Sequence, residues 1–246
     1  MSNSHSPVDL DQFQLDVQLQ QQPNDTSCGP TCLHSIYHFY GDDIPLDRVV
    51  REIPELENGG TLAVQLGLHA LKRGYRSKVW TFNLRIFDPT WFHNGKPKEG
   101  LKEKLAFQVE HRPDEKRRTA AASYLSYLNQ GGEIRFGVLS GRLIRNLLQG
   151  QFPLIVGLSS TFLYGASREI PSSNAEDDLR GDPCGHFVTL CGYDRKSRLV
   201  KVADPYRDHP VSQAGYYHVE LDRLINAILL GVLTYDGNLL HIYPHH

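Results

Sequence analysis

The sequence predicts an α+β fold, in which helices come first and a largely antiparallel sheet follows. Three stretches near the start, 28–40, 44–53 and 59–74, place apolar residues at helical spacing. After them, period-two alternation and short apolar runs predict strands at 75–82, 152–158, 186–193, 199–203, 215–219 and 239–243. Further helices are predicted at 140–149 and 221–230. A chain of 246 residues with 40% hydrophobic residues can bury the core of one large domain.

The first helix begins at a position that suits a cysteine nucleophile. Asp25, Thr26 and Ser27 can cap this helix, and Pro30 fits a first turn because its missing N–H has no helical partner there. The thiol of Cys28 would meet the positive end of the helix dipole and free backbone N–H groups, which favour the reactive thiolate. The stretch therefore predicts a nucleophile at Cys28.

Two residues of the second half are expected at one end of neighbouring strands. His186 begins a strand, and Asp204 follows the next one, across a polar turn at 194–198. Antiparallel pairing brings such ends together. The Asp204 carboxylate could then hold one imidazole nitrogen while the other faces the thiol of Cys28.

A side-chain amide precedes the cysteine at a useful distance. Gln22 lies six residues before Cys28, close enough to point an amide N–H at an oxyanion beside the sulfur. This spacing resembles that of the papain-like cysteine peptidases. The stretch from Gln22 to Gly29, followed by an apolar helix, is similar to the bacteriocin-processing (double-glycine leader) peptidase family, which is bacterial.

That family continues with a Gly-His-aromatic-apolar strand and, further along, an Asp-Pro pair. Both are present, as Gly185-His-Phe-Val-Thr-Leu190 and Asp204-Pro205. The resemblance implies a papain-like fold in which N-terminal helices carry the cysteine and a C-terminal sheet carries His186 and Asp204 in direct contact. It further implies that Cys28 is the nucleophile, His186 the base, Asp204 its orienter and Gln22 an oxyanion residue.

The polar region at 83–132 is predicted to be a helical insertion, a lid or side wall of the core, with helices near 101–109 and 114–128. Its Asp88-Pro-Thr-Trp-Phe92 motif resembles a stand-alone branch of the family that lacks transporter domains. The simpler reading is a turn whose two aromatic residues anchor the insertion. Otherwise Trp91 would line a substrate groove, as Gly185 would beside His186. That branch also accompanies ATP-grasp peptide ligases, which implies such a ligase as a partner.

The remaining segments complete a single domain over 1–246. Residues 1–12 are predicted to be a mobile tail, and ordered structure is expected to begin near Gln22. Residues 159–183 form a long polar loop, which predicts a flap beside the site.

Composition gives no sign of a nucleic-acid or membrane partner. The formal net charge of −2 gives no reason to expect a nucleic-acid partner. The longest apolar run, 225–235, is too short to cross a bilayer, and no signal peptide is visible. Four cysteines do not make a disulfide framework, which predicts a reducing, cytoplasmic compartment.

The other cysteines offer alternatives. A metal set of Cys28, Cys32, Cys184 and His186 is disfavoured, because zinc ligands usually come as a pair in a tight turn rather than four apart on a helix. No metal or cofactor is therefore expected. Cys32 and Cys191 are predicted to be core residues, whereas Cys184 could form a regulatory disulfide with Cys28.

These residues predict a cysteine peptidase or amidase that hydrolyses a peptide or protein substrate through an acyl-enzyme at Cys28. Two alternatives remain open. One is acyl or γ-glutamyl transfer at the same site, in which an amine replaces water. The other is a peptidase-like module that binds peptides without turnover.

Overall fold

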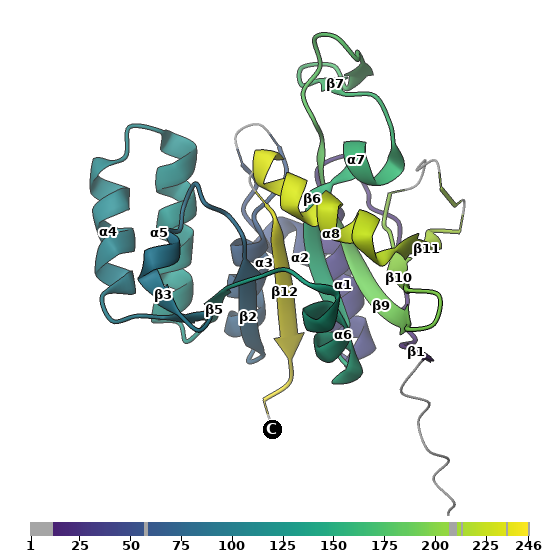
Figure 1. Cartoon of the computed structure of the whole chain (residues 1–246), viewed down its shortest axis with the longest axis horizontal. Helices are drawn as coiled ribbons and strands as arrows, with labels where there is room; N and C mark the ends of the chain where they lie inside the picture. The colour runs from purple at the N-terminus through teal and green to yellow at the C-terminus, as the bar shows by residue number, and fades with distance from the viewer. Residues whose placement is uncertain (1–11, 57–58, 207–210, 213, 235, 246) are drawn as a thin grey trace, which may run out of the picture.

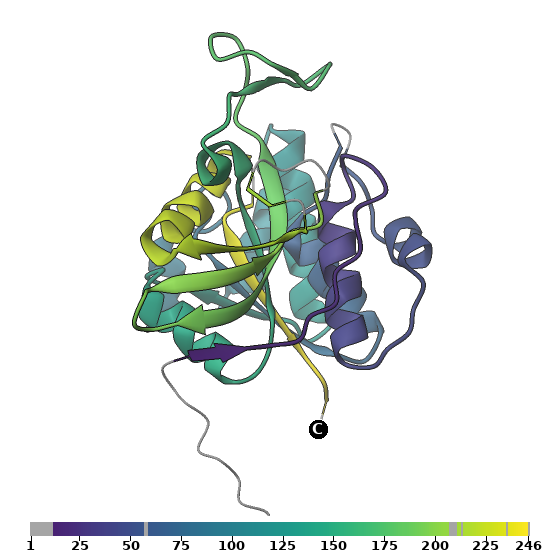
Figure 2. The same ribbon diagram turned by 90° about the vertical axis from the view of Figure 1, so that its right-hand side faces the viewer.

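The computed structural model describes residues 12–56, 59–206, 211–212, 214–234 and 236–245. The predicted mobile tail lies outside these residues except for Gln12, which begins the first strand. An eight-stranded sheet forms the centre, with helices on both faces (Figures 1 and 2). The predicted α+β fold is confirmed.

The sheet runs in the order β11-β10-β9-β6-β12-β2-β5, and β1 pairs with β9 beside this path. Its strands are β1 (Gln12–Gln14), β2 (Arg76–Thr81), β5 (Glu133–Phe136), β6 (Leu154–Ser159), β9 (Gly185–Asp194), β10 (Leu199–Ala203), β11 (Tyr216–Glu220) and β12 (Asn238–Tyr243). Among these pairings only β2 with β5 is parallel, so the sheet is mostly antiparallel, as predicted.

Two helical layers cover the sheet. On one face lie α1 (Cys28–Phe39) and α3 (Ala63–Lys72), with α2 (Leu46–Glu52) packed on α1. On the other face lie α6 (Gly141–Gln149) and α8 (Leu221–Leu230), which Figure 2 shows across the sheet from α1. Successive strand residues supply the two cores alternately: Leu239 packs with the α6 and α8 side and Leu240 with the α1 and α3 side.

Residues 83–132 form a helical lobe at one edge. The lobe contains a 3₁₀ turn, η1 (Pro89–Trp91), a small hairpin of β3 (Phe92–His93) and β4 (Lys96–Pro97), and the helices α4 (Leu101–His111) and α5 (Glu115–Asn129). Helix α5 packs against α3, and the buried Leu105 and Tyr127 belong to the same core as α1. The lobe and the sheet therefore share one hydrophobic core.

Three segments differ from the predictions. The 159–183 stretch is not a plain loop: it holds helix α7 (Ser160–Tyr164) and a projecting hairpin of β7 (Glu169–Ile170) and β8 (Ala175–Glu176), at the top of Figure 1. Order begins before Gln22, because β1 pairs with β9 and Val17 is buried. Helix α3 begins at Ala63, several residues after the start of the predicted helical stretch at 59–74.

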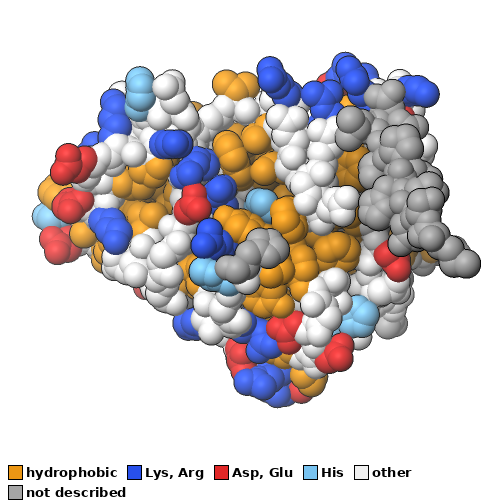
Figure 3. All heavy atoms as spheres, turned by 90° about the horizontal axis from the view of Figure 1, so that it is seen from below, with side chains coloured by type: hydrophobic (Ala, Val, Ile, Leu, Met, Phe, Trp, Pro, Cys, Tyr) orange, Lys and Arg blue, Asp and Glu red, His pale blue; other side chains and the backbone are white. Residues whose placement is uncertain are grey.

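The end of the molecule opposite the β7–β8 hairpin has hydrophobic side chains across its middle, interrupted left of centre by a group of charged side chains, and further charged side chains near its edges (Figure 3). Within the parts of the chain that the structure describes, no helix has the length and apolar character needed to cross a bilayer.

Candidate active site

Cys28 is the first residue of α1, and its side chain is almost buried. The preceding Ser27 does not cap the helix with its side chain, since its hydroxyl donates to the Asn24 carbonyl at 3.1 Å. The next residue has to be small: a Cβ at Gly29 would lie 2.8 Å from the Thr61 methyl carbon and 3.1 Å from the Phe187 ring. The start of α1 therefore packs tightly against β9, the strand that carries His186.

The pairing of β9 with β10 brings the predicted base and its orienter together. Ala203 pairs with Thr189, so the next residue, Asp204, leaves the sheet beside the start of β9. There Nε2 of His186 lies 2.8 Å from Oδ1 of Asp204. Because Nε2 is bonded to Asp204, Nδ1 is the ring nitrogen of His186 left for the thiol of Cys28. A hydrogen bond with the Cys28 side chain is among the causes that raise the pKa of His186.

The Asp204 carboxylate is buried and accepts four hydrogen bonds. His186 Nε2 and the backbone N–H of Tyr206 donate to Oδ1, the latter at 3.0 Å. The hydroxyls of Tyr164 and Tyr217 donate to Oδ2 at 2.7 and 2.8 Å. Burial alone would raise the pKa of Asp204, but the charge and hydrogen bonds of its donors lower it to about 2. The carboxylate is therefore fixed in both charge and position.

His186 is held as a cation by its two partners. Burial lowers the pKa of His186, but the charges of Asp204 and Cys28 and its hydrogen bonds to both raise it to about 10. An imidazolium beside the sulfur is the partner that a thiolate nucleophile needs.

Gln22 is attached to the same region but makes a local bond. Its backbone N–H donates to the Pro205 carbonyl at 2.9 Å, which ties it to the segment after Asp204. Its Nε2 donates to the Asn24 carbonyl at 2.9 Å, and its buried Oε1 has no partner among the described residues. One amide N–H of Gln22 is thus left for a ligand in the cleft.

A cleft of about 820 Å³ joins these residues. Gln22, Cys28, Gly185 and His186 all line it. Gly185 pairs with Ser159, and a Cβ there would lie 2.6 Å from the Thr234 hydroxyl. A side chain at this position would therefore collide with Thr234, which also lines the cleft.

Trp91 is not brought to this cleft. It lies in the helical lobe, where it lines a separate cavity between η1 and α4. The turn reading of the Asp88 motif fits better: Asp88 caps η1 by accepting from the Thr90 N–H at 2.8 Å, and Phe92 is buried in the core.

The other cysteines have different surroundings. The thiol of Cys32 donates to the Phe187 carbonyl at 3.3 Å, and that of Cys191 to the Lys201 carbonyl at 3.7 Å. Burial raises the pKa of Cys32, and raises those of Cys184 and Cys191 to about 11. All four cysteines are free thiols, and no group of three His, Cys, Asp or Glu residues in the described ranges could hold a metal ion.

Three polar residues of the site escaped the sequence analysis. The two tyrosines that hold Asp204, Tyr164 and Tyr217, come from α7 and β11, and nothing in their local sequence marks them. Asp236 also lines the cleft, although it is 7% exposed, and its Oδ2 accepts the Ala63 N–H at the start of α3. A lone Asp after an apolar run gives no sign of this role.

No protein-family model matches the chain, and no curated protein matches it. Solved structures do resemble it. A C39-like peptidase from Bacillus anthracis is 13% identical, with a TM-score of 0.48, over 95% of this chain and 98% of that one. A double glycine motif protease from an AMS/PCAT transporter, solved with its leader peptide, is 14% identical, with a TM-score of 0.45, over 94% of each chain. Xylellain, a cysteine protease from Xylella fastidiosa, is 14% identical, with a TM-score of 0.43, over 96% of this chain and 87% of that one.

These structures carry the names of the families that the sequence resembles. At identities of 13–14% and TM-scores below 0.5 these likenesses carry no argument about this chain, so we argue the activity from the arrangement of Cys28, His186 and Asp204.

Proposed function

We propose that this protein is a cysteine peptidase or amidase. The observation that carries the proposal is the position of His186, held by Asp204 through Nε2 at 2.8 Å and hydrogen-bonded to Cys28 on its other side. A thiol, an imidazole and a carboxylate in this order form the arrangement that activates a cysteine for attack on an acyl carbon.

The reaction follows from the roles of the three side chains. The Cys28 sulfur attacks the carbonyl carbon of the scissile bond, and a tetrahedral oxyanion forms. His186 then gives its Nδ1 proton to the leaving amine, which departs and leaves a thioester on Cys28. The neutral imidazole next takes a proton from water, which attacks the thioester and releases the acid. Asp204 holds the ring in one orientation throughout.

The oxyanion would be held by two donors. The backbone N–H of Cys28 lies in the first turn of α1, where helical N–H groups have no partner within the helix. The spare amide N–H of Gln22 is the second. Preorganised donors of this kind stabilise the charge that develops on the oxygen.

The remaining features of this proposal come from the sequence. The substrate is a peptide or protein, and 1–246 is one peptidase domain with 83–132 as an insertion. A bacterial, cytoplasmic setting and an ATP-grasp ligase as partner complete it. The transporter protease solved with its leader peptide is consistent with a peptide substrate here.

Acyl or γ-glutamyl transfer would use the same thioester, with an amine in place of water. No contact in the site favours an amine acceptor. Mass analysis of products, with and without added amines, distinguishes transfer from hydrolysis.

The test combines turnover with labelling. A peptide mixture should be cleaved by the parent protein and not by Cys28→Ala, and mass spectrometry should find an acyl adduct on Cys28. Iodoacetamide at pH 6 should label Cys28 well ahead of Cys32, Cys184 and Cys191, whose thiols have raised pKa values. Cys184→Ser, which alters another thiol of the same cleft, is the matched control and should keep full activity.

The His186→Ala variant tests the pairing itself. It leaves α1 in place but removes the cation, so the labelling advantage of Cys28 at pH 6 should shrink greatly. If Cys28 reacts no faster than the other thiols in the parent, or if His186→Ala leaves its rate unchanged, the proposed pairing does not operate.

A further inference from the structure

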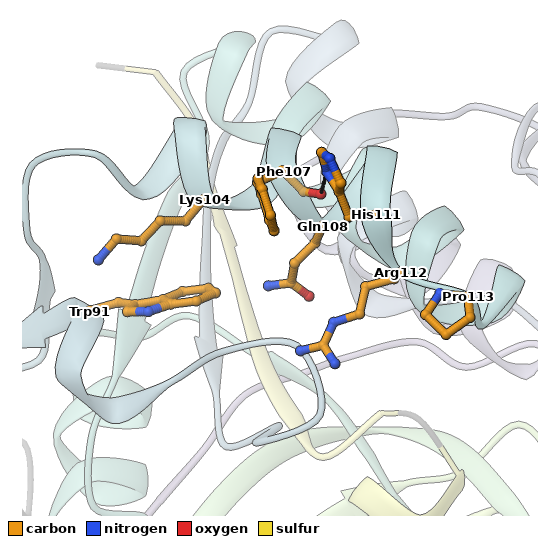
Figure 4. Close-up of a pocket in the computed structure, with 7 residues that line it drawn as sticks. All are labelled: Trp91, Lys104, Phe107, Gln108, His111, Arg112 and Pro113. Atoms are coloured by element: carbon orange, nitrogen blue, oxygen red, sulfur yellow. Dashed lines mark hydrogen bonds between the residues drawn. The ribbon is translucent and has the colours of Figure 1, made fainter.

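A second cavity, of about 480 Å³, lies in the helical lobe between η1 and α4. We call it the lobe pocket; it is lined by Trp91, Lys104, Phe107, Gln108, His111, Arg112 and Pro113. It shares no lining residue with the cleft around Cys28. Figure 4 shows these side chains around one opening, with the amide of Gln108 between Trp91 and Arg112.

Each of two aromatic rings of the lobe pocket, Trp91 and Phe107, has another side chain against one of its faces. Nζ of Lys104 lies 5.4 Å from the centre of the Trp91 ring. The His111 ring stacks on Phe107 at 4.0 Å between centroids and 12° between planes. Phe107 nevertheless remains 62% exposed, so aromatic surface is left over for a further ring.

Gln108 is the buried polar group of the pocket. Its side chain is 5% exposed, and Nε2 donates to the Ile86 carbonyl at 2.8 Å. This bond fixes which end of the amide is nitrogen. Oε1 is buried and has no partner among the described residues. A buried acceptor without a partner is costly, so Gln108 offers one acceptor and one spare N–H side by side.

The charge of the pocket lining is positive. Lys104 and Arg112 contribute, and no acidic residue of the described chain lines the cavity. Two acids act on lining residues from outside the pocket: Asp88 on Lys104, and Glu110 on His111, whose Nδ1 lies 3.9 Å from Oε2 of Glu110. Arg112 forms no ion pair with any residue of the described chain. An anionic group would therefore find a free guanidinium there.

We propose that the lobe pocket binds an adenine nucleotide. The acceptor and donor of Gln108 match the amino group and the neighbouring ring nitrogen on one edge of adenine. The exposed faces of Trp91 and Phe107 would stack on the base, and Arg112 and Lys104 would hold the phosphate. The volume also falls in the range of small-molecule sites.

Fluorescence offers a direct test, because Trp80 and Trp91 are the two tryptophans of the chain. In a Trp80→Phe background, titration with adenosine monophosphate should change the emission of Trp91 in a saturable way. Adenosine lacks the phosphate and should bind about 10-fold more weakly. Inosine monophosphate, which replaces the amino group by a carbonyl, should also bind about 10-fold more weakly.

The variants locate the site. Gln108→Leu and Arg112→Gln should each weaken adenosine monophosphate at least about 10-fold. The matched control is Lys102→Gln, an exposed lysine on α4 that does not line the pocket, and it should bind as the parent does. Arg112→Gln removes a charge without touching the Gln108 bond to Ile86, so its result stands if Gln108→Leu misfolds.

Three results would overturn the inference. They are no saturable change up to millimolar nucleotide, equal affinity for the adenosine and inosine monophosphates, and unchanged affinity in Arg112→Gln. The binding measurement needs no peptidase activity, so it is independent of the function proposed for Cys28.

Discussion

The hydroxyl of Tyr164 donates to Oδ2 of Asp204 at 2.7 Å. Tyr164 is the last residue of α7, the short helix that leads into the β7–β8 hairpin. The carboxylate that orients His186 is therefore tied to the base of the hairpin beside the cleft. The hydroxyl of Tyr217, from β11, donates to the same oxygen at 2.8 Å, so two separate elements, α7 and β11, hold the Asp204 carboxylate.

Tyr164→Phe removes one donor from an ionised, buried carboxylate. Hydrogen bonds to charged groups contribute roughly 1.5–3 kcal/mol, and part of this should reach the transition state through His186. We expect kcat/KM for peptide hydrolysis to fall about 3- to 30-fold. Because Asp204 loses a bond to its charged form, the acidic limb of the pH profile should move to higher pH. The matched control is Tyr216→Phe, whose hydroxyl donates to the Val17 carbonyl, and an equal loss there would contradict the assignment.

The pair of His186 and Asp204 should make stability depend on pH in a defined direction. The pKa of His186 is about 10 in the folded protein, against about 6.5 for an unperturbed histidine. Its contribution to the free energy of unfolding is then complete below about pH 6.5 and lost as the pH rises to about 10. Asp204, at about 2, behaves in the opposite way: its contribution is present above about pH 4 and lost as the pH falls to about 2.

Urea unfolding of the parent and of His186→Gln checks this. The difference in the free energy of unfolding between the two proteins should be largest near pH 6 and should shrink towards pH 10. A difference that stays constant over this range would mean that His186 is not held as a cation.

The fold was predictable because its main elements are regular in sequence. Helical spacing marked α1, α2 and α3, and the polar turn at 194–198 fixed the β9–β10 hairpin. The meeting of His186 and Asp204 then followed from antiparallel pairing. Strand β5 was not predicted, because it has four residues and pairs in parallel with β2, which is distant in sequence. Strand β1 was missed because its three residues are mostly polar and only pairing with β9 orders them.

The site was predictable only where short motifs carried it. Cys28 and His186 stand in recognisable local patterns, whereas Tyr164, Tyr217 and Asp236 reach the site through the fold. Trp91 is the opposite case. Its motif in the sequence was compatible with either a substrate groove or an anchoring turn, and the structure places it in the helical lobe. Whether such an aromatic residue lines the cleft depends on where the fold places its side chain, which the residue type does not indicate.

Asp236 should reveal its burial through pH-dependent stability. Burial raises the pKa of Asp236 to about 7, although the Ala63 N–H and the Asn238 side chain both donate to it. Since this pKa lies above the unfolded value of about 3.9, the stabilising contribution is present below about pH 4 and lost as the pH rises to about 7. Between pH 4.5 and 8, the parent should therefore lose on the order of 2–4 kcal/mol of unfolding free energy relative to Asp236→Asn.

Urea unfolding of both proteins at the two pH values measures this difference. Asp194→Asn is the control: the Ser197 side chain and turn N–H groups lower the pKa of Asp194, so no such change should appear above pH 4.5. If the free energy of unfolding depends on pH equally in the parent and in Asp236→Asn, burial does not raise the pKa of Asp236.

The cleft around Cys28 has an acidic lining. Carboxylates from Asp25, Glu169, Glu176 and Asp182 line it, and among the described residues no Lys or Arg does. Three of these come from the β7–β8 hairpin and the segment that follows it. The hairpin also contacts the loop before Cys28, since Nδ2 of Asn174 donates to Oδ2 of Asp25 at 3.2 Å. A peptide in the cleft would therefore run beside several negative charges.

We expect peptides with basic residues near the cleaved bond to be preferred. In matched peptides that differ by Lys or Glu at one position, kcat/KM should be about 10-fold higher for Lys at low ionic strength. The preference for the Lys peptide should narrow in about 1 M salt, where the screening length falls to about 3 Å.

The double variant Glu169→Gln with Glu176→Gln should reduce this preference. It should leave hydrolysis of a small uncharged ester unchanged, because neither side chain reaches Cys28, His186 or Asp204. The control is Glu110→Gln, an exposed change on α4, which should alter neither the preference for the Lys peptide nor the hydrolysis of the ester. Equal rates for the Lys and Glu peptides at low salt would show that these carboxylates do not select the substrate.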